Sequence, residues 1–309
     1  GTLDTVSTWV CPFKVVIRST AAVGVLSYLR FGYSGNGYTD YEYYGIKVEP
    51  AYITLDANRI GTSFDGRGRW GFTTFPALNR GVGFMVDGVG SLMNDGGFLV
   101  GKDASHVSNN IENQSGGGDV HFTNVNPIRK TNGGAVADVE GNATFSDAGA
   151  GGNAIGLTVD QRSYQWSMDS EDDYIIQEYT IKNTSGTPQN GLYAGMYFDL
   201  DGFWRTQNRS HYDPISRAIY NMDTTWVSLW DIGVSLLTPD SLRGFACNTT
   251  TFGYTLADKW TALTSPPQGA ELGPANVAQF AGAGPFNIAA GDSHVVAFAI
   301  LLGDSLAGM

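Results

Sequence analysis

Acidic residues around two predicted strands are the side chains of this sequence best placed to do chemistry. Asp199 and Asp201 stand two apart, so they point to one face of a strand, while Asp172 and Asp173 come just before the preceding strand. Carboxylate oxygens are the ligands that Ca²⁺ prefers. The four residues therefore predict a structural Ca²⁺ site, the chain's one candidate cofactor, with solvated loop acids as the alternative. The pattern is not an EF-hand, because Phe203 occupies the fifth position of the loop.

The same pair of acids allows a second hypothesis. Glycoside hydrolysis uses two carboxyl groups about 5 to 10 Å apart. Asp199 and Asp201, as strand neighbours two apart, fit the lower end of this range. A secreted hydrolase that uses these carboxylates is therefore an alternative function, although many acids on β-strands would pass the same test.

Two short motifs imitate catalytic signatures. The run Gly303–Leu306 spells a signature of serine esterases, but only three residues follow it, too few to supply a downstream base. The run Gly66–Gly71 matches the glycine pattern of dinucleotide-binding loops, yet strand-forming residues follow where a helix would have to begin. Both runs are predicted to be turns, with Arg67 and Arg69 as exposed loop charges. We therefore predict that the chain is not an enzyme.

Aromatic residues crowd into one short segment near the N-terminus. Seven of the 17 residues from Tyr28 to Tyr44 are tyrosine or phenylalanine, interleaved with small polar residues. Tyrosine offers a rigid, amphipathic surface that suits a protein interface or the face of a sugar ring. The residues predicted to form an interface or to bind a ligand are Tyr33, Tyr38, Tyr41, Tyr43 and Tyr44. A core edge whose hydroxyls reach water is the remaining interpretation.

The amino-acid composition excludes several classes of protein for this chain. Among 309 residues, 18 are Lys or Arg and 30 are Asp or Glu, which makes the net charge −12, and only 16% are charged. Such an acidic chain lacks the cations that supply most of the affinity for nucleic acid. Its 42% of hydrophobic residues argue against disorder. No apolar run approaches the ~18 residues that a membrane-spanning helix needs.

The two cysteines, Cys11 and Cys247, lie far apart in sequence. A disulfide between them and two separate buried thiols are both open, and neither cysteine has the close partner of a zinc or redox motif. The chain begins at Gly1, so a signal peptide is expected to have been removed already. Loops rich in Asn, Thr, Ser and Gly favour an extracellular or cell-surface location.

Strand signals recur along the whole chain. Short β-branched and aromatic runs bounded by turn residues predict an all-β fold, a large antiparallel β-sandwich of the jelly-roll or supersandwich kind. Tyr174–Lys182 and Leu192–Asp201 are predicted to form a long hairpin or neighbouring strands, with one face of the second strand open to solvent or a ligand. Val295–Leu302 is apolar on both faces and is predicted to be a central strand covered on both sides. Leu256–Leu263, ended by two prolines, is the one predicted short helix.

The sequence allows two divisions into domains. A single sandwich unit over residues 1–309 fits the lack of a charge shift or Pro-rich linker. The glycine tract Gly149–Gly152 near the midpoint allows a subdivision into 1–150 and 151–309, and thus two packed sandwiches.

A series of motifs, in order along the chain, resembles one group of proteins. The motifs are Leu55–Gly61, Gly83–Val86, Leu92–Gly101, Val107–Asn110, Asp172–Ser185, Gly191–Asp199 and Gly291–Ser293. They resemble poorly characterised β-rich regions of large secreted bacterial proteins, which often lie downstream of subtilisin-like protease domains and precede a type IX sorting tail. The resemblance covers residues 50 to 309 and implies export to the cell surface or medium. It does not imply proteolysis, because the protease motifs are not in this sequence.

These features together predict a non-enzymatic extracellular structural protein that assembles with copies of itself, as a filament or surface layer, or that binds other surface proteins. The N-terminal segment through Ile17 is predicted to pair with a neighbour's sheet as an added strand. A carbohydrate-binding module that uses the tyrosines and the secreted hydrolase are the alternatives.

Overall fold

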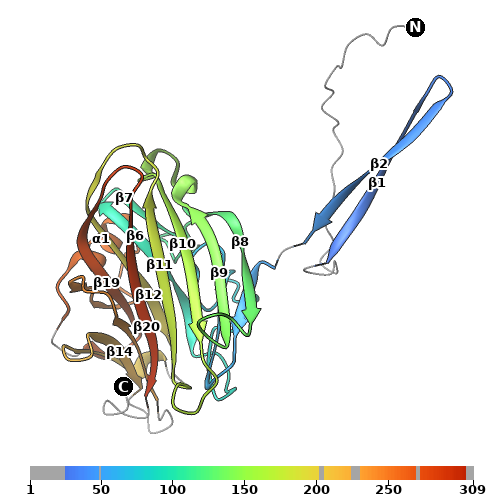
Figure 1. Cartoon of the computed structure of the whole chain (residues 1–309). Coiled ribbons are helices and arrows are strands. Elements are labelled where there is room, and N and C mark those ends of the chain that lie inside the picture. The colour runs from blue at the N-terminus through green and yellow to red at the C-terminus, as the bar shows by residue number, and fades with distance from the viewer. Residues whose placement is uncertain (1–24, 49, 202–204, 224–229, 269–271, 304–309) are drawn as a thin grey trace. The chain divides into compact units, whose positions relative to one another are not determined.

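The chain folds as two units, residues 1–50 and 51–309. The structure is a computed structural model, and it describes residues 25–48, 50–201, 205–223, 230–268 and 272–303. The first unit contributes a two-stranded hairpin and the second a β-sandwich (Figure 1). The chain therefore divides near Pro50 and not near residue 150, because β9 (Val139–Ser146) and β10 (Leu157–Gln165), on either side of that tract, pair in one sheet.

The larger sheet of the second unit has nine antiparallel strands. In order across the sheet they are β18 (Leu272–Ala275), β13 (Asn208–Asp213), β14 (Ala218–Asp223), β15 (Asp231–Leu236), β20 (Ser293–Gly303), β11 (Tyr174–Asn183), β10, β9 and β8 (Thr123–Asn132). The predicted central strand Val295–Leu302 lies in β20, the middle strand of the nine. The prediction of a central position is confirmed, but the strand is not covered on both faces, because Val295 is 41% exposed.

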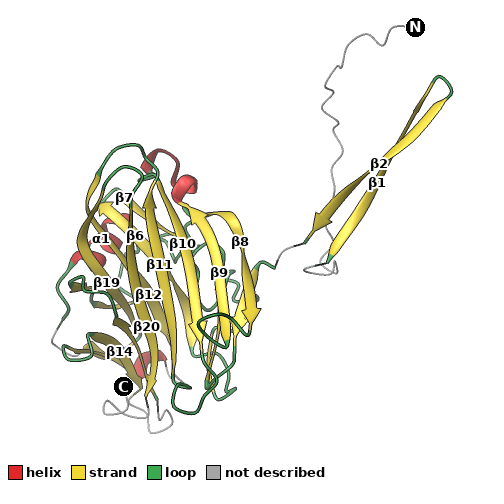
Figure 2. Cartoon of the chain, viewed as in Figure 1, coloured by secondary structure: helices red, strands yellow, loops and turns green. Residues whose placement is uncertain are grey.

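A six-stranded sheet forms the second layer. Its strands are β16 (Leu242–Arg243), β19 (Val277–Ile288), β12 (Gln189–Leu200), β6 (Met93–Asp103) and β7 (His106–Asn109) in order, with β17 (Ala246–Asn248) also paired to β19. Three short strands, β3 (Tyr52–Leu55), β4 (Ile60–Asp65) and β5 (Phe84–Val86), form a further sheet. Strands dominate this unit (Figure 2), which confirms the predicted all-β sandwich.

The main core joins the two large sheets. Phe98 of β6 stacks on Tyr179 of β11, with ring centroids 4.1 Å apart. Phe145 of β9 and Phe298 of β20 belong to the same buried cluster. Burial of each such side chain contributes about 1.5–3 kcal/mol, so these aromatic contacts are a main reason why the sheets stay together.

Strands β11 and β12 do not form the predicted hairpin, because they belong to different sheets. Asn183 at the end of β11 donates from its side-chain amide to the carbonyl oxygens of Thr187 and Ile288, at 2.7 and 3.0 Å. These bonds hold the chain where it passes from one sheet to the other. The side chains of β12 do alternate between two faces of the strand. Both faces are buried, however, one in the main core and one in a second core.

The second core lies between the six-stranded sheet and helix α1 (Leu256–Thr264). Thr255 and Asp258 form a capping box that begins the helix, and Pro266 follows its end. A Cβ atom added to Gly101 of β6 would lie 3.0 Å from the Trp260 ring of the helix, so the missing side chain permits this close approach. The predicted short helix is confirmed. No helix in the described part of the chain has the length and apolar character that crossing a membrane requires.

Candidate functional site

The aromatic segment forms a regular β-hairpin from β1 (Leu26–Gly35) and β2 (Tyr38–Lys47). Asn36 and Gly37 make the turn, with φ angles of 44° and 83°. Positive φ at both central residues identifies a type I′ turn, for which Asn-Gly is the preferred sequence. The turn fixes the register, so each residue of β1 lies opposite one residue of β2.

Side-chain alternation gives the hairpin two faces. The first, which we call the basic face, carries Leu26, Tyr28, Arg30, Tyr41, Tyr43 and Lys47. The second, the acidic face, carries Leu29, Phe31, Tyr33, Tyr38, Asp40, Glu42, Tyr44 and Ile46. Both faces are therefore rich in aromatic rings, and they carry charges of opposite sign.

On the basic face, the guanidinium carbon of Arg30 lies 5.5 Å from the centre of the Tyr41 ring. Tyr41 in turn meets the edge of Tyr43, with centroids 5.4 Å apart and ring planes at 77°. A cation over an aromatic face at an exposed site contributes about 0.5–1 kcal/mol. These contacts order the side chains of this face without covering them.

On the acidic face, two tyrosine hydroxyls are bonded to neighbouring carboxylates. Tyr38 Oη donates to Asp40 Oδ2 at 2.6 Å, and Tyr44 Oη donates to Glu42 Oε2 at 2.9 Å. These hydrogen bonds raise the pKa of both tyrosines and lower the pKa of Asp40. Phe31 meets Tyr44 edge to face, with centroids 5.2 Å apart.

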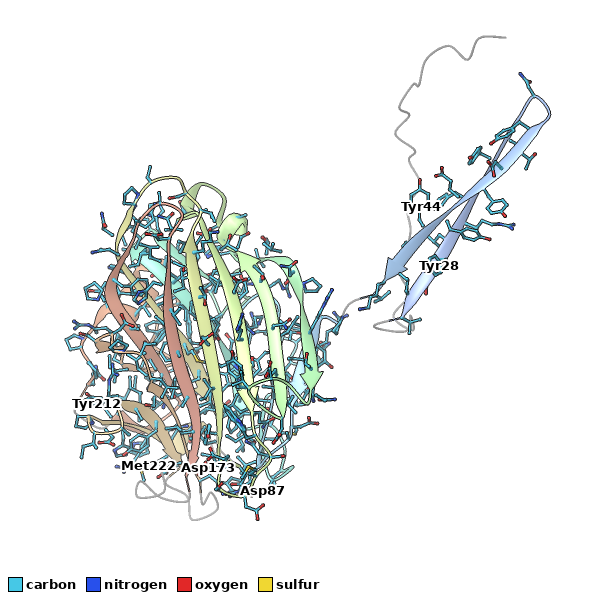
Figure 3. All side chains as sticks on the ribbon, in the orientation of Figure 1. Tyr28, Tyr44, Asp87, Asp173, Tyr212 and Met222 are labelled. Carbon is cyan, nitrogen blue, oxygen red and sulfur yellow. The ribbon has the colours of Figure 1, made fainter. Side chains whose placement is uncertain are left out.

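Among the described residues, the hairpin is open to solvent on both faces. The five predicted tyrosines are 47–58% exposed, and Tyr28 is 66% exposed. Figure 3 labels Tyr28 and Tyr44 on the hairpin. Neither strand pairs with a third strand in the described chain. The structure thus brings the predicted interface tyrosines together on one exposed element, and the core-edge interpretation is wrong for them.

The four predicted Ca²⁺ ligands do not come together. In the described parts of the chain, no group of three or more His, Cys, Asp or Glu side chains is arranged to hold a metal ion. Asp172 and Asp173 precede β11, where their backbone carbonyls accept from the N–H groups of Arg59 and Leu302. Asp199 lies in the other large sheet. Ca²⁺ binding stays a prediction, and the positions of these four carboxylates do not support it.

Asp199 is only 1% exposed, although its face of β12 was expected to meet solvent or a ligand. Its Oδ2 atom accepts from Asn94 Nδ2 at 3.0 Å. Burial, followed by the charge of Asp201, raises the pKa of Asp199 well above its usual range. The second core around Tyr197 accounts for the burial. A carboxyl group enclosed in this way has no room for a glycoside beside it, so the geometry does not favour the hydrolase hypothesis.

Three predictions fall partly outside the described residues, and one of them is the turn at Gly303–Leu306, of which only Gly303 is described. Cys11 and the segment through Ile17, expected to add to a neighbour's sheet, are not among the described residues. Cys247 on β17 is a free thiol, 5% exposed, and burial raises its pKa. Because the thiolate is the reactive form, burial disfavours reaction of this thiol. A bridge between Cys11 and Cys247 stays a prediction.

A buried ion pair was missed in the sequence. Arg69 is 5% exposed, and its Nη2 donates to Asp95 Oδ1 at 2.5 Å. The turn at Gly66–Gly71 folds back on β6, where the N–H of Trp70 donates to the carbonyl of Gly96 at 2.9 Å. The expected exposed charge is therefore wrong for Arg69. It is right for Arg67, whose side chain is 42% exposed. Nothing in the local sequence separates these two arginines.

Another cation, Lys259 of α1, is fully buried. Its Nζ donates to Asp119 Oδ2 at 2.8 Å and to Asn109 Oδ1 at 2.9 Å. Arg69 and Lys259 thus have structural partners that compensate their charges, which is the condition for burying a cation. The hairpin, in contrast, presents its tyrosines to solvent.

The sequence matches no known protein-family model, and no curated protein is similar enough to be a relative.

Proposed function

We propose that the chain is a non-enzymatic extracellular structural protein that assembles with copies of itself into a filament or surface layer. The observation that carries the proposal is the hairpin, aromatic and exposed on both faces. A two-stranded hairpin is marginally stable by itself in water, because it has no sheet or helix to pack against. A contact that covers its faces would therefore stabilise the hairpin and join chains in one step.

The charges of the hairpin favour a second copy as the partner. Arg30 stands on the basic face, whereas Asp40 and Glu42 stand on the acidic face. If the basic face of one copy lies on the acidic face of the next, unlike charges meet around an aromatic layer. Two identical faces would instead bring like charges together. When each contact joins two different surfaces, one end of the stack keeps a free basic face and the other a free acidic face. Further copies can add at both ends, so the assembly grows into an open filament.

Carbohydrate binding by the same tyrosines is the weaker alternative. A sugar ring stacks on a flat aromatic surface, but the rings of Tyr41 and Tyr43 meet at 77° and those of Phe31 and Tyr44 at 89°. The hydroxyls of Tyr38 and Tyr44 already donate to their own neighbouring carboxylates. Edge-to-face rings and occupied hydroxyls suit interlocking side chains of a protein contact better than a sugar platform.

The extracellular part of the proposal depends on the resemblance to secreted bacterial regions and on the composition. With 16% charged residues, the surface carries little of the charge that keeps proteins apart. The net charge of −12 opposes association at long range. At moderate ionic strength, salt screens this long-range repulsion. A short-range contact between aromatic rings and opposite charges then outweighs it.

The test is the oligomeric state of the full chain over a wide concentration range, by sedimentation velocity and negative-stain electron microscopy. We expect the wild type to form concentration-dependent oligomers and extended particles. The variant Tyr28→Ser/Tyr41→Ser/Tyr43→Ser removes the aromatic rings of the basic face and should sediment as a monomer.

The control is the variant Val136→Ser/Ile215→Ser, which removes side chains that are 63% and 92% exposed on the sandwich. It should assemble as the wild type does. A wild type that is monomeric at every concentration contradicts the proposal, and so does a tyrosine variant that assembles normally.

A further inference from the structure

A groove of about 560 Å³ lies on the outer face of the nine-stranded sheet, over β8, β9 and β10. Beside it, β8 departs from regular pairing with β9 between Asn124 and Asn126 and again between Asn126 and Arg129. Pro127 lies in this stretch and has no N–H to donate to a neighbouring strand. Bulges bend a strand and increase its twist, which accounts for a hollow at this edge of the sheet.

Polar side chains line the groove in rows that cross the strands. Two rows consist of Asn126 with Thr144 and Asp160, and of Arg129 with Asn142 and Arg162. Glu140 and Tyr164 face each other in the next row. The two arginines balance the two carboxylates, so the groove offers donors and acceptors side by side with no net formal charge.

Both carboxylates of the groove are held in place. Thr144 Oγ1 donates to Asp160 Oδ1 at 2.6 Å. Glu140 Oε1 accepts from the backbone N–H of Val136 at 2.6 Å, a bond that lowers the pKa of Glu140. Groups fixed before a ligand arrives lose less entropy when they bind it.

An aromatic cluster adjoins the groove. Tyr164, which lines the groove, stacks on Trp166 with ring planes at 27° and centroids 6.4 Å apart. Trp166 also contacts Tyr174 at 5.6 Å and donates from Nε1 to the carbonyl of Val136 at 3.2 Å. The ring planes of Tyr164 and Trp166 are closer to parallel than those of the aromatic pairs on the hairpin, which meet at 40° to 89°.

We propose that this groove binds a short neutral oligosaccharide. Each sugar hydroxyl both donates and accepts hydrogen bonds, so it matches a surface on which arginine and asparagine donors alternate with carboxylate acceptors. The apolar faces of sugar rings match near-parallel aromatic side chains. The volume is that of an ordinary ligand site, and the balance of charge gives no preference to an anion. The proposal does not depend on assembly through the hairpin.

The experiment is isothermal titration calorimetry of the full chain with four probes: maltohexaose, xylohexaose, mannohexaose and, as the anionic comparison, hexagalacturonate. We expect saturable binding of at least one neutral probe. The variants Asn142→Ala and Arg162→Ala remove exposed side chains from the middle row and should each weaken that binding about tenfold. Lys182→Ala removes an exposed charge from β11 outside the groove and should leave the affinity unchanged.

Thermal melting of each variant establishes that it is folded as the wild type is. The proposal is overturned if no neutral probe binds, if hexagalacturonate alone binds, or if the two groove variants bind a neutral probe as tightly as the Lys182→Ala control. Sedimentation in the presence of the probe separates this result from assembly, because the hairpin is unaltered in all three variants.

Discussion

Lys259 and Asp119 form an ion pair of 2.8 Å, although 140 residues separate them in the chain. The pair fastens α1 to the segment that follows β7, next to the six-stranded sheet. Burial lowers the pKa of Lys259, and the carboxylate of Asp119 opposes that shift. Asp119 thus supplies a counter-charge to the fully buried lysine from a distant part of the sequence.

Removing the acidic partner should therefore be costly. We expect Asp119→Asn to lower the free energy of unfolding by about 3 kcal/mol, because it leaves a buried cation without its counter-charge. Urea denaturation followed by circular dichroism measures the change. Lys259→Met removes the charge together with its need for a partner and should cost less. An Asp119→Asn chain as stable as the wild type would show that the pair contributes nothing.

Glu112 should make stability depend on pH. Burial, followed by the charge of Asp95, raises the pKa of Glu112 from 4.5 to about 7. The folded chain therefore holds this proton more tightly than the unfolded chain, so the stabilisation is complete below about 4.5 and disappears as the pH rises through about 7.

The variant Glu112→Gln isolates this effect, because glutamine does not titrate. Between about pH 5 and pH 8 the wild type should lose stability relative to Glu112→Gln, as measured by urea denaturation at a series of pH values. Parallel pH profiles of the two chains would mean that the Glu112 pKa is the same folded and unfolded.

The hairpin turn offers a matched pair of glycine variants. Gly37 has a φ of +83°, and a Cβ atom added there or at Gly35 would meet no atom within 4 Å. Only Gly37→Ala is therefore strained, by about 1–2 kcal/mol, because an L-residue disfavours the left-handed conformation. Sedimentation velocity should show weaker assembly for Gly37→Ala and unchanged assembly for Gly35→Ala, with the same sandwich melting temperature. If Gly37→Ala and Gly35→Ala assemble equally well, the hairpin is not part of the assembly contact.

A charge exchange tests how the hairpins stack. Arg30→Glu/Lys47→Glu reverses both charges of the basic face, which makes both faces acidic and should abolish assembly. The fourfold variant that adds Asp40→Lys/Glu42→Arg exchanges the signs of the two faces and should recover assembly. Arg30 and Glu42 lie on opposite faces of one hairpin, so the recovery has no explanation within a single chain. Chemical cross-linking and electron microscopy measure the outcome. If the fourfold variant folds normally and still does not assemble, the hairpins do not stack with alternating faces.

The parts of the fold that follow from local sequence were predictable. The apolar run of β20 indicated a central strand, and Thr255, Asp258 and two prolines mark the start and end of α1. The aromatic interleaving of residues 28–44 marked the segment that the structure presents to solvent. In each case, the signal and the structure that it specifies lie within a few residues of each other.

What depends on distant packing was not predictable. The alternation of β12 indicated one open face, but α1 and its flanking loops cover that face, so Asp199 is buried. Arg69 looks like its neighbour Arg67 in sequence and is distinguished by distant partners, the carboxylate of Asp95 and the backbone carbonyl of Asn110, 26 and 41 residues away. The groove over β8 depends on a change of strand register, and register is a property of two strands together.

The unlike faces of the hairpin also bear on how an assembly would grow. A stack of such hairpins has polarity, with a basic face open at one end and an acidic face open at the other. The two ends would then grow at different rates, as they present different chemistry to an incoming chain. A chain carrying Arg30→Glu/Lys47→Glu keeps its acidic face intact but has lost its basic face. Mixed into the wild type as a small fraction, it would add to the basic end and stop growth there, while the acidic end continues to grow.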